Sequence, residues 1–149
     1  MKIGELCSRV VVFAYKNMPL TEAAKLMREH HVGSLIVVRE DDSKRTPVGI
    51  ITDRDIVVEV LAAGLDFRTL TVGEIMTDEL ITAREQDDTL DVLGLMRKRG
   101  IRRVPVVTPS GALAGIATID DILGVLSEEL DGIVRAIDGE QAKEVAKRR

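Results

Sequence analysis

The chain has 149 residues, of which 45% are hydrophobic and 31% charged, and its formal net charge is −4. This composition is typical of a folded protein with one domain or two small ones, and it excludes a disordered chain. The acidic balance disfavours broad nucleic-acid binding because neutralising phosphates requires a basic face, and two Phe, one Tyr and no Trp leave little for stacking on bases.

A single cysteine, Cys7, excludes an intrachain disulfide and a paired-cysteine metal site. No apolar run approaches the roughly 18 residues that are needed to cross a membrane. Residues Met1–Glu5 lack the shape of a signal peptide, since an acid interrupts them before any long apolar core. We therefore expect a cytoplasmic protein with no membrane or nucleic-acid partner.

In chain order, the first half predicts a strand, a helix, two strands and a helix. Apolar periodicity and turn residues place these elements. They are strand Val10–Phe13, helix Glu22–His30, strands Ser34–Val38 and Val48–Ile51, and helix Asp53–Ala63, which ends at Gly64 before the linker Leu65–Leu70.

The second half repeats this order. Sliding the chain by 69 positions superposes Lys2–Val38 on Thr71–Val107 without a gap, and later segments superpose at an offset of 66, with the difference in one polar loop. The repeat predicts a strand at Leu80–Thr82, a helix that ends at Arg99, strands Arg103–Val107 and Ala112–Ala117, and helix Ile119–Asp131. Pro105 suits an edge strand or a bulge, because proline cannot donate to a ladder.

The expected fold class is α+β, with two βαββα repeats packed about a pseudo-twofold axis. A repeat of this length cannot bury a sheet face and two helices convincingly alone, so the two should pack together. We assign residues 1–66 to the first repeat, 67–131 to the second and 132–149 to a C-terminal helical tail. Its apolar Ile133, Val134 and Ile137 favour a docked or frayed helix over a nucleic-acid arm.

One stretch occurs twice, as Gly49–Ile56 and Gly115–Ile122. Each copy predicts an apolar strand that ends in a threonine, with an aspartate three residues later at the start of a helix. The helix start favours an anion, and the carboxylate can accept two hydrogen bonds from vicinal hydroxyls, so a ribose phosphate suits the pair. Helix capping alone also explains a threonine and an acid at this spacing, and the two roles are compatible.

These paired motifs, inside matching repeats, resemble a pair of cystathionine β-synthase (CBS) domains, the Bateman module. Leu26-Met27, Leu95-Met96 and the Val104–Val107 strand support the resemblance, which covers roughly residues 1–131. It implies adenosine ligands such as AMP, ADP, ATP or S-adenosylmethionine, bound between the repeats. By resemblance, the motif aspartates hold the ribose hydroxyls and the motif threonines lie near phosphate.

The resemblance implies two clefts, each completed by the opposite repeat. Thr52 and Asp55 would face Met76, Ile81 and the segment Ile101-Arg102-Arg103-Val104-Pro105, whereas Thr118 and Asp121 would face Cys7, Val12 and Val32-Gly33-Ser34-Leu35. Arg102 and Arg103 stand where the other repeat has Gly33 and Ser34. Our hypothesis is that the Thr52/Asp55 cleft prefers a phosphorylated nucleotide; alternatively, the two arginines are a solvated pair at a helix end.

No pattern in the sequence indicates catalysis or a metal site. His30-His31 has no nearby Cys or Glu at metal spacing and suits the C-terminal end of a helix dipole, and Cys7 is favoured as a small apolar filler. We expect a stand-alone regulatory module without cofactor or chemistry of its own, a homodimer that signals to a separate protein. The alternatives are a ligand-free interaction module and a nucleotide-processing enzyme.

Overall fold

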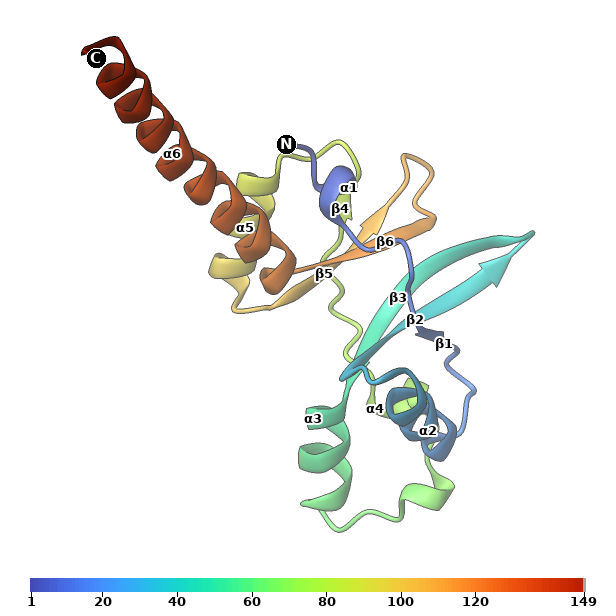
Figure 1. Cartoon of the computed structure of the whole chain (residues 1–149). Coiled ribbons are helices and arrows are strands. Elements are labelled where there is room, and N and C mark those ends of the chain that lie inside the picture. The colour runs from blue at the N-terminus through green and yellow to red at the C-terminus, as the bar shows by residue number, and fades with distance from the viewer. Residues whose placement is uncertain (149) are drawn as a thin grey trace.

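The computed structural model describes residues 1–148 and has two three-stranded sheets with flanking helices (Figure 1). The strands are β1 (Phe13–Ala14), β2 (Ser34–Asp41), β3 (Lys44–Thr52), β4 (Ala83–Arg84), β5 (Arg103–Val107) and β6 (Leu113–Thr118). The helices are α1 (Ile3–Leu6), α2 (Leu20–His30), α3 (Asp53–Asp55), η1 (Ile56–Leu61), η2 (Phe67–Thr69), α4 (Val72–Ile75), α5 (Thr89–Arg99) and α6 (Ile119–Arg148). The predicted α+β duplication is confirmed.

Both sheets have the same topology, with strand orders β1-β2-β3 and β4-β5-β6. In each sheet the first pair is parallel and the second is an antiparallel hairpin. The first and fourth strands begin later than the sequence predicted, at Phe13 instead of Val10 and at Ala83 instead of Leu80. The preceding residues are extended but have only isolated pairing, such as the 3.3 Å bond from Ile36 N–H to the carbonyl oxygen of Val12.

Each hydrophobic core takes a short helix from the other half of the chain. Ile3 and Cys7, at α1, pack in the core of β4, β5 and β6, whereas Val72, in α4, packs in the core of β1, β2 and β3. Two reciprocal backbone bridges accompany this exchange, Ser8 with Ile116 and Thr77 with Ile50. The two halves are therefore interlocked, which fixes how the motifs of one face the strands of the other.

Pro105 lies in the central strand β5, opposite Ile116, and one residue before an irregularity in the register. Of the two expectations for Pro105, the edge strand is therefore wrong, whereas the irregularity beside it agrees with a bulge. The position is tolerable because β4 pairs only from Val106 onwards and Ile116 gives its own backbone bonds to Ser8.

The two motif helices differ from their predicted lengths. The first is α-helical only for Asp53–Asp55 and continues as the π-helical η1, in which the N–H of Ala62 reaches the carbonyl oxygen of Val57 at 2.8 Å. The second, α6, passes Asp131 without a break and projects away from both sheets (Figure 1). Gly132 and Gly139 each lower the stability of the helix by about 1 kcal/mol relative to alanine, but they do not interrupt it. The sequence has no proline after them that would end the helix. No helix among residues 1–148 is both long and apolar enough to cross a membrane.

Candidate functional site

Both motifs form a reciprocal capping box at the start of a helix. In the second, the backbone N–H of Thr118 donates to Asp121 Oδ2 at 3.1 Å, and the N–H of Asp121 donates to Thr118 Oγ1 at 3.1 Å. In the first, the corresponding distances between Thr52 and Asp55 are 2.9 and 3.1 Å. Each aspartate is half-buried, and its capping bond uses Oδ2. Oδ1 of each carboxylate therefore has lone pairs that a ligand could use.

A cavity of ≈ 200 Å³ lies beside the second motif. Its residues come from the extended segment before β1, from the start of β2 and from the β5–β6 hairpin. They are Val10, Val11, Val12, Val32, Gly33, Ser34, Ile36, Arg103, Ile116 and Thr118. The structure thus brings Thr118 together with its predicted partners Val12, Val32, Gly33 and Ser34. The walls are mainly apolar, and the polar side chains among them are those of Ser34, Arg103 and Thr118.

Arg103 lies in this cavity, although the sequence hypothesis assigned it to the cleft of Thr52 and Asp55. The register of the β5–β6 hairpin explains the difference, because it pairs Arg103 with Thr118. Side chains of directly opposed residues project from the same face of a sheet. The hairpin turn at Pro109–Gly111 was visible in the sequence, but regular counting back from it would have placed Arg103 opposite Ala117. The irregularity between Val106 and Val107 shifts the pairing by one residue and sets Arg103 opposite Thr118.

Arg102 points elsewhere. Its guanidinium lies 3.6 Å from Asp120 Oδ1, both side chains are mostly exposed, and it lines an outer groove with Ile101 and residues of α5. The structure does not bring Ile101 or Arg102 to Thr52. Of the other residues predicted for that cleft, Met76 packs on the first core, Ile81 is half-buried ahead of β4, and Pro105 is buried in β5.

Cys7 does not line the cavity beside Thr118. It is 8% exposed and packs in the second core, and burial raises the pKa of its thiol above the usual value. Sequence reasoning missed four lining residues, Val10, Val11, Ile36 and Ile116. The apolar alternation of their strands is the same signal that marks a core face, so it gives no separate indication of a cavity.

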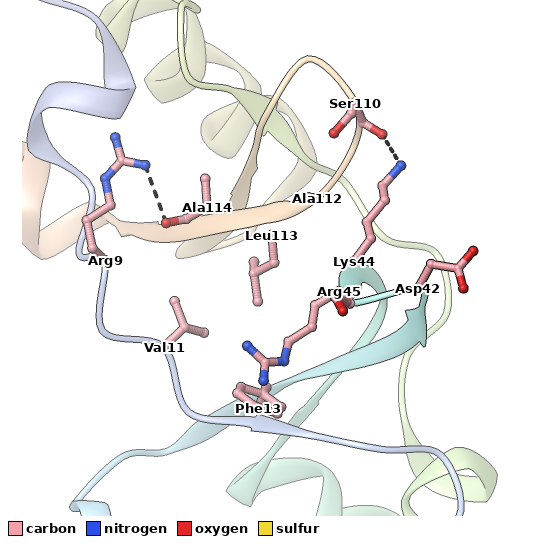
Figure 2. A pocket seen from close by; sticks show the side chains of 11 residues that line it. Arg9, Val11, Phe13, Asp42, Lys44, Arg45, Ser110, Ala112, Leu113 and Ala114 are labelled. Carbon is pink, nitrogen blue, oxygen red and sulfur yellow. Dashed lines mark hydrogen bonds between the residues drawn. The ribbon is translucent and has the colours of Figure 1, made fainter.

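Figure 2 shows a second cavity, of ≈ 470 Å³, between the β2–β3 turn and the β5–β6 hairpin. Arg9 donates to the carbonyl oxygen of Ala114 at 3.4 Å, Lys44 donates to that of Ser110, and the Arg45 guanidinium lies 4.5 Å from the centre of the Phe13 ring. No predicted site residue lines this cavity. Its cations are held by neighbouring groups of the protein, so the smaller cavity remains the candidate site.

The comparison with known families agrees with the paired motifs, the duplicated sheets and the cavity between the halves. The CBS domain profile matches residues 3–62 and 72–128. The chain belongs to the CBS domain family. Each matched segment contains one Thr-x-x-Asp capping box.

Similar CBS proteins include an uncharacterised protein of Methanopyrus kandleri, 38% identical over 125 residues, which cover 84% of this chain and 62% of that protein. The chain thus spans less than two thirds of that relative. The crystal structure of the CBS domain pair of protein MJ0100 with 5′-methylthioadenosine and S-adenosyl-L-methionine is 32% identical, has a TM-score of 0.74 and covers 87% of this chain and 98% of that one. The CBS domain protein PAE2072 of Pyrobaculum aerophilum, complexed with AMP, is 28% identical with a TM-score of 0.73, covering 81% and 89%.

Proposed function

We propose that this CBS pair is a regulatory module that binds an adenosine ligand, of the class of AMP, ADP, ATP or S-adenosylmethionine, in the cavity beside Thr118. The observation that carries the proposal is the convergence of the motif threonine Thr118, Arg103 and valine-rich walls from both repeats on one cavity, with Asp121 bonded to Thr118 in the capping box. The ligands of two similar CBS proteins support it, since both contain adenosine compounds.

The residues of the cavity divide naturally among the parts of a nucleotide. The cavity is smaller than the roughly 300–1,000 Å³ of ordinary small-molecule pockets, so it suits the base, with sugar and phosphate extending outwards. Val12, Val32 and Ile116 would cover the purine faces. Asp121 Oδ1 would accept from the ribose hydroxyls, and Arg103 would pair with the phosphate.

The equivalent position in the first repeat is less suited to an anion. At the offset of 69 residues, Ser34 stands where the second repeat has Arg103, and Glu79 stands where the first has Val10. We therefore propose that phosphate is preferred at the Thr118 side, the reverse of the hypothesis drawn from the sequence.

Binding would act by shifting a conformational equilibrium, which a ligand can do only through different affinities for the two states. We propose that the module works as a homodimer in the cytoplasm, carries out no reaction of its own, and passes this shift to a separate protein. Within residues 1–148, no three His, Cys, Asp or Glu side chains lie close enough together to hold a metal ion.

A thermal-shift panel with adenosine, AMP, ADP, ATP and S-adenosylmethionine tests the proposal. A ligand at 100 times its dissociation constant stabilises the fold by roughly 2.7 kcal/mol, or about 5–10 °C here. Asp121→Asn keeps an oxygen for the Thr118 N–H but loses the charge, so the unliganded melting temperature should stay and the ligand shift should fall. Asp55→Asn is the matched control. The proposal fails if no compound gives a shift, or if Asp121→Asn leaves the shift intact.

A further inference from the structure

The larger cavity of Figure 2 lies where the tips of the two β-hairpins meet. Lys44, which follows the β2–β3 turn, donates to the carbonyl oxygen of Ser110 in the β5–β6 turn. The cavity, of ≈ 470 Å³, is within the range of roughly 300–1,000 Å³ that small-molecule sites occupy. Of the described residues, Val11 alone lines both this cavity and the one beside Thr118. The two cavities are therefore neighbours with otherwise separate linings.

Lys44 brings to this cavity a positive charge that no carboxylate within 4.0 Å neutralises among residues 1–148. Both arginines of the lining are paired, Arg9 with Glu85 at 3.4 Å and Arg45 with Glu40 at 3.0 Å. Asp42 is exposed, so water screens its carboxylate, which Figure 2 shows pointing away from the cavity. Lys44 itself is half-buried, and a partly desolvated cation favours an anionic partner.

The polar groups that line the cavity are mainly hydrogen-bond donors. Within the described part of the chain, the ammonium of Lys44 makes one hydrogen bond and the terminal nitrogens of Arg45 make none. Ser43 adds a hydroxyl at the second position of a two-residue turn, with φ of 68°, where glycine is the usual residue. A carboxylate matches these donors, because it only accepts and a guanidinium can bind both of its oxygens.

The remainder of the lining is apolar and half-buried. It comes from the segment before β1 and from the start of β6, and consists of Val11, Phe13, Ala112, Leu113 and Ala114. In Figure 2, the side chains of Val11, Phe13 and Leu113 lie together, apart from the ammonium of Lys44 beside Ser110. A ligand that fills the cavity would therefore need an apolar body at one end and an anionic group at the other.

We propose that this cavity binds a small carboxylic acid with an apolar body. Its carboxylate lies between Lys44 and Arg45, and its body packs on Val11, Phe13 and Leu113. The carboxylate supplies the counter-charge that Lys44 lacks, and the body removes half-exposed apolar surface from water. This site is distinct from the nucleotide cavity proposed above and does not depend on nucleotide binding.

Amide NMR spectroscopy tests the site with a matched pair of compounds. Naphthoate is the probe, and naphthalenemethanol has the same apolar body without the charge. Naphthoate should shift the amide signals of Val11, Ser43 and Leu113 in a saturable way, and the alcohol should bind about 10-fold more weakly. The proposal is overturned if naphthoate causes no saturable shifts, or if its shifts centre on Ser34 and Thr118.

Three variants test the role of the lining. Lys44→Gln loses the charge but keeps an N–H donor for the carbonyl oxygen of Ser110, so it should weaken naphthoate binding about 10-fold and leave the alcohol unchanged. Arg39→Gln removes a charge from the same hairpin, where Arg39 pairs with Asp41 outside this cavity, and should change neither. Ser43→Gly suits the left-handed turn and should weaken naphthoate binding roughly 2- to 10-fold. Equal affinities for the wild type and Lys44→Gln, or equal losses in Lys44→Gln and Arg39→Gln, overturn the proposal.

Discussion

Ser8 and Ile116 exchange two backbone hydrogen bonds, each of 2.9 Å, and so join the residues after α1 to strand β6. The chain can come this close only because Gly115 has no side chain. A Cβ at that position would lie 2.6 Å from the carbonyl oxygen of Ser8 and 2.8 Å from Cys7 Sγ. The oxygen belongs to the backbone and cannot swing away, so the bridge must shift if Gly115 is replaced.

We predict that Gly115→Ala destabilises the fold by about 1–3 kcal/mol, the usual cost of overpacking. Urea unfolding followed by circular dichroism measures the change. Gly94→Ala, in α5, is the control, since no atom lies within 4 Å of the added Cβ and alanine favours a helix by about 1 kcal/mol. The two substitutions should therefore change stability in opposite directions; equal effects would contradict the role of the bridge.

The duplication, the order of the strands and the motif helix starts could be predicted because each depends on local sequence. The 69-residue offset relates His31 to Gly100 and Ile36 to Pro105, and these pairs hold the same places in the two halves. The exchange of α1 and α4 between the cores could not be predicted. Ile3 and Val72 are buried by residues far away in sequence, and periodicity does not identify such partners.

The residues that line the cavity were predicted only in part, because periodicity does not identify contacts between residues far apart in sequence. Val12 and Ser34 were assigned to the side of Thr118 and line its cavity, whereas Arg103 was assigned to the wrong side. The assignment of Arg103 was wrong because it assumed that each repeat gives a whole segment of chain to the cleft of the other repeat. The hairpin register, a short-range property, determines where Arg103 lies.

The two long helices that precede the hairpins end in the same way, but with different residues. The residue that caps the C-terminal end of α2 is His31, with φ of 55°, and the one that caps α5 is Gly100, with φ of 66°. Left-handed backbone costs a residue with a side chain roughly 1–2 kcal/mol, and glycine avoids most of this cost. We predict that His31→Gly stabilises the fold by about 1 kcal/mol, or 2–4 °C in melting temperature, after allowing for the entropy of glycine in the unfolded chain.

Gly100→Ala is the reciprocal test of this helix end. No atom lies within 4 Å of the Cβ that it adds, so any loss of stability comes from the backbone alone. It should lower the melting temperature by a similar amount. If both substitutions moved the melting temperature in the same direction, the left-handed conformation would not be the cause.

The neighbouring arginines provide a matched pair for the phosphate contact. Arg103 lines the cavity beside Thr118, whereas Arg102 is exposed next to Asp120. We predict that Arg103→Ala weakens AMP binding by about 10-fold or more, the effect of 1.4 kcal/mol, and leaves adenosine binding unchanged. Arg102→Ala should change neither, because an exposed ion pair contributes little. Calorimetric titration of both ligands measures this, and a preference for AMP that survives in Arg103→Ala contradicts the assignment.

The thiol of Cys7 should be protected by the interlocked halves. Burial raises its pKa, while the Arg9 guanidinium opposes part of that shift, so the reactive thiolate is scarce at neutral pH. We predict that iodoacetamide modifies the native protein at pH 7.5 at least 100-fold more slowly than the urea-unfolded chain, since access and ionisation are both reduced. The rate should rise with pH across the alkaline range, because deprotonation is the limiting condition.

Gly115→Ala, which disturbs the contact with Cys7 Sγ, should speed the native reaction, and Gly94→Ala should not. Fast modification of the native wild type would contradict the packing of α1 in the second core.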